Sequence, residues 1–321
     1  MKRSLSLATH FATFVLVSIA QSADKATCSG NLVPFKEAGK WGFKDALGKT
    51  IIEPKYDNVG AFSSGLAPVN MGAQAENLFN SSIKTGGIWG YVDVRGKLVV
   101  PITLDYACKF SDGLAQVRNH QGVRYLDPSG KVVIDLGHVS QAGDFHEGVA
   151  PVYEDRFTQG KDWKTRFIDK NGRAAFMVDG YAEEFYDGMA VLTVAQEKID
   201  PKVSNERRLD GYIDRTGKVA IPLRFAEALA FHEGLAAVRP KKTTVWRMGD
   251  TWGYIDKSGK YAIEPQFNEA HPFRDGVARV HVGGTLQTPF HGIPFWEGGQ
   301  WRLIDRTGKV LKRSTEWLEY N

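Results

Sequence analysis

The chain has few of the residues and patterns on which catalytic and metal-binding proteins depend. Only two of its 321 residues are cysteines, and neither has a histidine near it in a metal-ligand spacing. No Gly-x-Ser-x-Gly or His-Glu-x-x-His pattern occurs, so the sequence signatures of α/β-hydrolases and zinc proteases are missing. We therefore expect no metal ion, no cofactor and no enzymatic activity.

The excess of positive charge is also small. The formal net charge is +4, from 41 Lys and Arg against 37 Asp and Glu. Without Lys2 and Arg3, which belong to the N-terminal segment considered next, 39 basic residues remain against 37 acidic ones. Basic residues form pairs such as Arg207-Arg208, and no cluster is longer than a pair. A nucleic-acid partner is therefore not expected.

Long hydrophobic runs are almost absent, and the run Phe11–Ala20 is too short for a typical membrane span. Lys2 and Arg3 precede it, and small residues follow, an order typical of a bacterial secretory signal. We predict a signal peptide over residues 1–23, a short segment over 24–30 and one repeat array over 31–321. Cleavage after Ala20, Ser22 or Ala23 fits the pattern, and an uncleaved anchor is the alternative. The mature protein is then periplasmic or secreted, without a membrane association.

The two cysteines, Cys28 and Cys108, allow one disulfide in an oxidising compartment. It would close a loop of about 80 residues and stabilise the fold by about 4 kcal/mol if unstrained. The alternative is two separate thiols, one near the N-terminus and one beside a strand.

What the chain does contain is a repeat of about 40 residues. Each copy has a Gly-Leu-Ala-x-Val strand, a Trp-Gly-Tyr-Ile-Asp-like strand and a Gly-Lys turn, as in Gly234–Val238, Trp252–Asp256 and Gly259-Lys260. Seven copies align, and a phenylalanine stands three residues before the first glycine in most of them. A fixed period of this length indicates stacked supersecondary units that bury their apolar faces against one another.

The turns after the Trp-Gly-Tyr strands have a regular chemistry. An aspartate opens each turn by accepting backbone N–H groups, and a glycine supplies the positive φ that closes it. These aspartates are therefore predicted to be structural: Asp93, Asp127, Asp169, Asp214, Asp256 and Asp305. His146 and His232 share one repeat position with Ser111 and Arg274, and such variety predicts an exposed loop residue with no metal role.

These patterns resemble the WG repeat, also called the KWG repeat, of bacterial proteins, over residues 31 to 311. The Trp-Gly pair is intact at Trp41-Gly42, Trp89-Gly90 and Trp252-Gly253. The resemblance implies tandem β-rich units and no common catalytic residue. We expect an all-β fold of about seven β-meander units, with a propeller-like ring slightly preferred over an open β-solenoid.

The repeats differ most between the Leu-Ala-x-Val strand and the Trp-Gly strand. Long insertions stand there at 70–88, 153–164, 193–209, 239–251 and 281–300. Insertions at one place of a repeat often build the binding face. The aromatic residues that we predict to bind a partner on this rim are Trp163, Trp246, Phe290, Phe295 and Trp296. Alternatively, these rings pack back onto the outer strands.

The sequence leaves three functions open. A non-catalytic binding scaffold with a protein or peptide partner on the insertion rim is preferred. A glycan-binding module would use the loop tryptophans as stacking platforms. A hydrolase or lyase would need paired carboxylates, for which Glu154, Asp155, Asp162 and Glu297 are the candidates on the rim.

Overall fold

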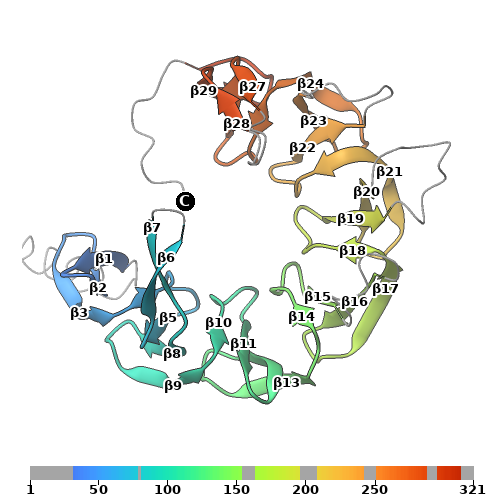
Figure 1. Cartoon of the computed structure of the whole chain (residues 1–321). Coiled ribbons are helices and arrows are strands. Elements are labelled where there is room, and N and C mark those ends of the chain that lie inside the picture. Colours follow the sequence, from blue (N-terminus) through green and yellow to red (C-terminus); the bar gives the residue numbers. More distant parts are fainter. Residues whose placement is uncertain are drawn as a thin grey trace, which may run out of the picture. The chain divides into compact units, whose positions relative to one another are not determined.

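The structure, a computed structural model, describes residues 32–78, 81–153, 163–195, 208–241, 251–287 and 295–311. Every regular element in these ranges is a strand (Figure 1). Within them, no helix is both long and apolar enough to span a bilayer. The predicted signal peptide, the segment 24–30 and the last ten residues lie outside the described ranges.

The strands follow one another in antiparallel groups, one group for each sequence repeat. Repeats 1 to 3 consist of β1 (Val33–Glu37), β2 (Lys40–Lys44) and β3 (Thr50–Tyr56); β4 (Asn58–Val59), β5 (Leu66–Met71), β8 (Ile88–Asp93) and β9 (Leu98–Leu104); and β10 (Tyr106–Ala107), β11 (Ala115–Asn119), β12 (Gly122–Leu126) and β13 (Val132–Gly137).

Repeats 4 to 7 continue the same order. They consist of β14 (Gln141–Ala142), β15 (Val149–Tyr153), β16 (Lys164–Asp169) and β17 (Ala174–Asp179); β18 (Tyr181–Ala182), β19 (Met189–Ala195), β20 (Arg208–Asp214) and β21 (Val219–Ala228); β22 (Leu235–Pro240), β23 (Trp252–Asp256) and β24 (Tyr261–Phe267); and β25 (Glu269–Ala270), β26 (Val277–Val282) and β29 (Gln300–Asp305). The long strand β21 belongs to both repeats 5 and 6 and joins them into one seven-stranded sheet.

This arrangement confirms the predicted all-β fold of tandem meander units. The chain divides into two compact units at residues 121–133. Repeats without a Trp-Gly pair also form paired strands, as β15, β16 and β17 do in repeat 4. Closure of the array into a ring stays a prediction.

The turn chemistry is as predicted. In the turn after β20, Asp214 Oδ1 accepts the N–H groups of Thr216 at 2.8 Å and Lys218 at 3.2 Å. Gly217 has a φ of +81°, a conformation that favours glycine. The equivalent aspartates make the same pair of bonds in the turns at residues 45–49, 93–97, 127–131, 169–173, 256–260 and 305–309.

The glycine of the Trp-Gly pair is required by the backbone of the strand that follows. In repeat 6 the pairing jumps from Trp252↔Phe267 to Tyr254↔Ile263, so β24 bulges outward between these partners. A Cβ atom on Gly253 would lie 2.7 Å from the Ile263 carbonyl oxygen, closer than real contacts allow. Three further glycines face a bulge of the same kind at 2.3–2.6 Å: Gly42, Gly90 and Gly211.

A proline lies within each of these bulges, at Pro54, Pro101, Pro222 and Pro265. Where arginine replaces the glycine, the strand is more regular. In repeat 4, Arg166 pairs with Met177 next to Phe167 with Phe176, and β17 contains no proline. The Trp-Gly glycine and the downstream proline therefore occur together, as the two sides of one β-bulge.

Neighbouring repeats are joined by pairs of buried aromatic rings. Tyr254 of repeat 6 meets Phe273 of repeat 7 edge-on, with ring centroids 4.9 Å apart, and both rings are almost fully buried. The Tyr254 hydroxyl donates a hydrogen bond to the His271 carbonyl oxygen at 2.8 Å. The corresponding edge-on pairs are Phe43–Phe62, Tyr91–Phe110, Phe167–Phe185 and Tyr212–Phe231.

Each turn glycine also rests against the preceding repeat. A Cβ atom on Gly217 would lie 2.7 Å from the Phe176 ring of repeat 4, whereas one on Gly48, in the first repeat, would meet nothing within 4 Å. The sequence predicted a backbone reason alone for these glycines. The structure adds a packing reason wherever a repeat precedes the turn.

We predict that Gly253→Ala destabilises the protein, because the new methyl group collides with the β24 bulge. The free energy of unfolding should fall by about 1–3 kcal/mol, as for other overpacked sites. Arg166→Ala, at the same repeat position without a bulge, should cost less than about 1 kcal/mol. Urea denaturation followed by tryptophan fluorescence measures both, and equal losses would contradict the role given to the bulge.

We also predict that Gly217→Ala is more costly than Gly48→Ala. Both residues have φ near +80°, so the backbone strain and the change in the unfolded chain are matched. Only Gly217 has a ring against it, and relieving that contact should add about 1–3 kcal/mol. If the two variants unfold at the same urea concentration, the contact between turn and preceding repeat contributes nothing.

Candidate functional site

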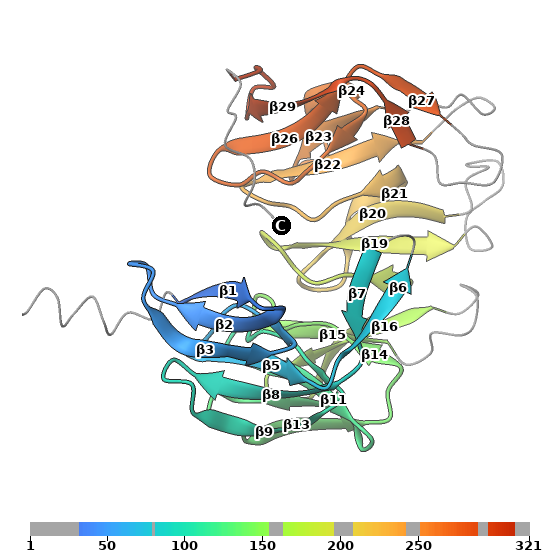
Figure 2. The ribbon, with the colours of Figure 1, turned by 60° about the vertical axis from the view of Figure 1, so that its left-hand side comes forward.

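All five predicted insertions leave from one place in the repeat, between the second and third strands of the four-stranded meander, such as β5 and β8. The insertion of repeat 2 forms a hairpin of β6 (Gln74–Leu78) and β7 (Ser81–Thr85), which extends away from β5 and β8 (Figure 2). That of repeat 7 forms a hairpin of β27 (Thr285–Gln287) and β28 (Phe295–Glu297). The sequence predicted long insertions at both places.

The glycines at the base of the second hairpin have a structural role. A Cβ atom on Gly284 would lie 2.9 Å from the Glu297 carbonyl oxygen, and one on Gly299 would lie 2.5 Å from that of Gly283. These positions let two backbones approach closely.

The five predicted binding aromatics have different outcomes. Trp163 lines a cavity, described below. Trp246 and Phe290 lie outside the described residues. Phe295 and Trp296 belong to β28, where they pair with Gln287 and Leu286 of β27. The role of these five residues in binding stays a prediction.

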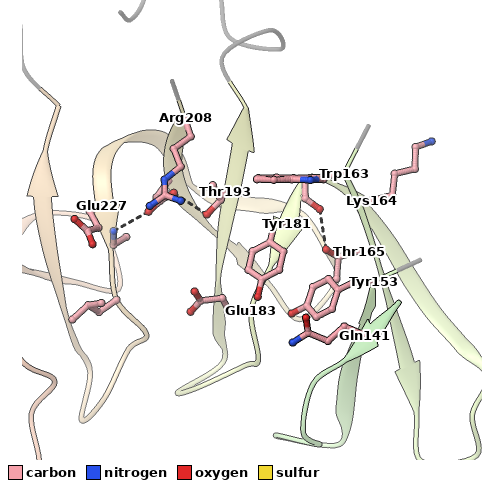
Figure 3. A pocket seen from close by; sticks show the side chains of 14 residues that line it. Gln141, Tyr153, Trp163, Lys164, Thr165, Tyr181, Glu183, Thr193, Arg208 and Glu227 are labelled. Carbon is pink, nitrogen blue, oxygen red and sulfur yellow. Dashed lines mark hydrogen bonds between the residues drawn. The ribbon is translucent and has the colours of Figure 1, made fainter. Parts of the chain in front are cut away.

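The candidate site is a cavity of about 490 Å³ between the sheets of repeats 4 and 5, both within one compact unit. Its volume lies in the range of small-ligand pockets, about 300–1,000 Å³. Tyr153 and Lys164 flank the insertion of repeat 4, and Arg208 follows the insertion of repeat 5. The cavity thus opens where these two insertions leave their sheets (Figure 3).

Aromatic rings form one side of this cavity, and Figure 3 shows them grouped there. Tyr153 and Tyr181 stack face to face, with centroids 4.7 Å apart and planes 13° apart. Trp163 meets Tyr181 edge-on at 6.1 Å. The Tyr153 hydroxyl is fixed by a 2.8 Å hydrogen bond that it donates to the Ala182 carbonyl oxygen. These rings give the cavity a preformed aromatic wall.

Carboxylates occupy the middle and the opposite side. Glu183 lies between the aromatic wall and the side that bears Arg208 and Glu227 (Figure 3). Glu227 is paired with Arg239 at 3.0 Å. Asp210 is buried, and its two oxygens accept hydrogen bonds from Thr193 Oγ1 at 2.8 Å and the Ala228 N–H at 3.0 Å.

Glu183 is the unusual member of this group. Loss of contact with water, and next the negative charge of Glu184, raise the pKa of its carboxyl group to about 7. Burial likewise raises the pKa of Asp210, although the bond from Thr193 opposes the shift. Within the described part of the chain, no residue makes a hydrogen bond or salt bridge to the Glu183 carboxylate. A half-buried carboxyl group is thus directed into the cavity without a direct partner.

The cavity exists because two tryptophan positions of the repeat hold small polar residues. Thr165 of repeat 4 and Asp210 of repeat 5 stand where repeat 6 has Trp252, which is buried in the core. Thr165 Oγ1 instead donates to the Gly180 carbonyl oxygen and accepts the Ala182 N–H, both at 2.9 Å. These two replaced tryptophans were the available signal for the site, together with Tyr181 and Glu183, and the sequence-based prediction of a binding site used none of these four residues.

The repeat position of His146 and His232 lies in the short turn before the second strand of each repeat. The prediction that His146 and His232 are exposed loop residues is wrong, because both are half-buried and contact the Tyr186 ring in a tilted arrangement, with ring centroids 4.4 and 4.9 Å apart. The neighbouring carboxylates link consecutive repeats: Glu147 accepts the Gly188 N–H, Asp187 that of Gly234, and Glu233 that of Gly276. The residues of this turn therefore connect each of these repeats to the next one.

The remaining predicted residues lie mostly beyond the described ranges. Cys28 is outside them, so its pairing with Cys108 stays a prediction. Glu154, Asp155 and Asp162 are also outside, and Glu297 is exposed on β28. In the described residues, no group of three or more His, Cys, Asp and Glu side chains is arranged to hold a metal ion.

Known protein structures resemble this fold. One, titled as the crystal structure of the eukaryotic initiation factor, shares 12% identity at a TM-score of 0.57, over 88% of this chain and 73% of that one. The β-propeller domain of the Trilobed protease from Pyrococcus furiosus, described as having an open velcro topology, shares 9% identity at a TM-score of 0.44, over 80% and 82%. The first likeness concerns the fold alone. No curated protein matches the sequence.

The sequence model for the WG containing repeat matches at residues 41–73, 89–121, 124–156, 211–241 and 252–285. These segments cover just over half of the chain. Each begins in the Trp-Gly-position strand of one repeat (β2, β8, β12, β20 or β23) and ends just after the second strand of the next repeat (β5, β11, β15, β22 or β26). The strands at the Trp-Gly position of repeats 4 and 7, β16 and β29, are not matched, although they pair with β15 and β26 as the equivalent strands of other repeats do. The chain therefore belongs to the WG containing repeat family.

Proposed function

We propose that the protein is an exported, non-catalytic binding scaffold of the bacterial periplasm or cell exterior, which holds a protein or peptide partner at its insertion rim. The cavity between repeats 4 and 5 is the centre of this site. The observation that carries the proposal is its position: residues that flank two insertions line the cavity, and insertions at one place of a repeat often build the binding face. Export rests on the basic, apolar and small residues of segment 1–23.

Its chemistry fits binding better than catalysis. A carboxylate that acts as a base or nucleophile needs an oxygen that can reach the substrate. The two oxygens of Asp210 are held by Thr193 and Ala228. A hydrolase or lyase would have to show turnover of glycoside or peptide substrates that Glu183→Gln abolishes.

A glycan-binding module is the second candidate. Trp163 and Tyr181 beside polar groups such as Gln141 offer the flat apolar faces and hydrogen-bonding groups that a sugar ring requires. A protein or peptide is preferred because residues that border two long insertions line the cavity, and insertions of this kind often bind a partner. Titration with soluble oligosaccharides separates the two candidates.

We predict that Tyr181→Ala greatly weakens capture of the partner. The mature protein, immobilised and exposed to envelope extract, should retain a partner that the variant loses, because a buried aromatic anchor contributes about 2 kcal/mol or more to binding. Tyr106→Ala is the matched control, since Tyr106 occupies the equivalent position of repeat 3 and is 50% exposed. Its capture should match that of the parent protein. Equal capture by all three proteins would refute this placement of the site.

A second prediction concerns the cost of the site to the fold. Because the folded protein raises the pKa of Glu183 to about 7, the folded state binds this proton more tightly than the unfolded state. The contribution of this carboxyl group to the free energy of unfolding is fully present below its unfolded pKa of about 4.3. It is lost as the pH rises through about 7. Glu183→Gln should therefore unfold at a higher urea concentration than the parent at pH 8, and the advantage should shrink at pH 4. A variant less stable at pH 8 would show that Glu183 supports the fold.

A further inference from the structure

The cavity has an electrostatic character that its aromatic wall alone does not reveal. Of the five charged residues that line it, two are paired with other residues: Glu227 with Arg239 at 3.0 Å, and Lys164 with Asp179 at 3.7 Å. The remaining three are Glu183, Asp210 and Arg208. Two carboxyl groups thus face one guanidinium group, and Arg208 is exposed at the mouth of the cavity.

We infer that this cavity binds the cationic group of a basic side chain, the guanidinium of arginine or the ammonium of lysine, presented by the partner peptide. The Glu183 carboxylate is the counter-ion, and the rings of Trp163 and Tyr181 are the walls against which the cation lies. This inference rests on the proposed function, because it assigns a ligand to the same site.

Two features of the cavity favour a cation over a neutral ligand: the Glu183 carboxylate and the aromatic faces. A carboxylate without a direct partner gains a charge-assisted hydrogen bond when a basic group enters. Trp and Tyr faces attract cations through their ring quadrupoles, most strongly where water is excluded. A neutral sugar would satisfy the hydrogen bonds of Glu183 but would leave its buried charge uncompensated.

The surroundings of Glu183 also set how binding depends on pH. The charged and titratable groups around it are Glu184 on its own segment, Asp210, Arg208 and Tyr212 on β20, Tyr153 on β15 and Tyr186 in the following turn. Burial raises the pKa of all three of these tyrosines, so they remain neutral through the range that matters. Only Arg208 opposes the raised pKa of Glu183. A second cation would favour ionisation, and binding near pH 6.5 should release a proton.

The experiment compares charged peptides with neutral isosteres by isothermal titration calorimetry on the mature protein. The probes are capped Gly-Gly-Arg-Gly-Gly and Gly-Gly-Lys-Gly-Gly, with citrulline and norleucine in place of the basic residue. At least one basic peptide should bind about tenfold or more tightly than its isostere. Repeating the titration at pH 6.5 in buffers of different ionisation enthalpy should reveal proton release. Affinity should fall about tenfold or more between pH 7.5 and 5.5 as Glu183 becomes protonated.

Glu183→Gln tests the counter-ion directly. This variant should lose about tenfold or more in affinity at pH 7.5 and should show neither the pH dependence nor the proton release. Glu269→Gln is the control, because Glu269 is an exposed carboxylate on β25 away from the cavity; it should bind as the parent does. Circular dichroism establishes that each variant is folded.

Several outcomes would overturn the inference. These are equal binding of citrulline and arginine peptides, unchanged binding by Glu183→Gln, and no binding of any basic peptide. Binding of cellopentaose or chitotetraose that is unaffected by Glu183→Gln would assign the cavity to glycans. If Tyr181→Ala still abolishes partner capture while basic peptides do not bind, the proposed function stands and the cationic ligand falls. If basic peptides bind but no partner is captured through Tyr181, the cationic ligand stands and the proposed function falls.

Discussion

The edge-on contact between aromatic rings of neighbouring repeats is the interaction on which the rest of this structure depends. A short meander cannot bury both of its faces by itself. The aromatic ring on its third strand becomes buried only when the phenylalanine of the next repeat packs against it. Such a pair contributes about 0.5–1.5 kcal/mol beyond the area that it buries. Because the Tyr254 hydroxyl also bonds the His271 carbonyl oxygen, the same residue fixes both distance and orientation between repeats. Stability is therefore shared between neighbours, as in other repeat proteins.

The candidate site uses a relaxation of this packing rule. The ring pairs are kept on both sides of the cavity, as Phe167–Phe185 and Tyr212–Phe231. Only the tryptophan positions, occupied by Thr165 and Asp210, have become small and polar. The repeats can thus stay in register while the space between them accepts a ligand. A carboxyl group with a raised pKa can be maintained there, because the surrounding contacts between repeats hold the fold together without it.

The sequence was informative about each repeat taken alone. Asp214 and Gly217 predicted a turn because they act on their own backbone, and the insertion positions followed from aligning the copies. It was less informative wherever a residue acts on a neighbouring repeat. Glu183 and Tyr153 are 30 residues apart and meet only because two sheets pack side by side, which no local pattern encodes. His146 and Tyr186 are 40 residues apart, and the 3.1 Å contact between the Tyr186 hydroxyl and His146 Nε2 was missed for the same reason.

The coupling of the Trp-Gly glycine to a proline bulge has a consequence for how such an array can evolve. Tandem genes grow and shrink by unequal recombination, and a crossover may fall at any codon. One that joined a third strand bearing arginine, as at Arg166, to a fourth strand of the proline type would force a side chain onto a backbone carbonyl. Viable exchanges must carry the third and fourth strands together. The heritable module is therefore this strand pair with its turn, and the boundaries of duplicated segments should fall in the loops outside it.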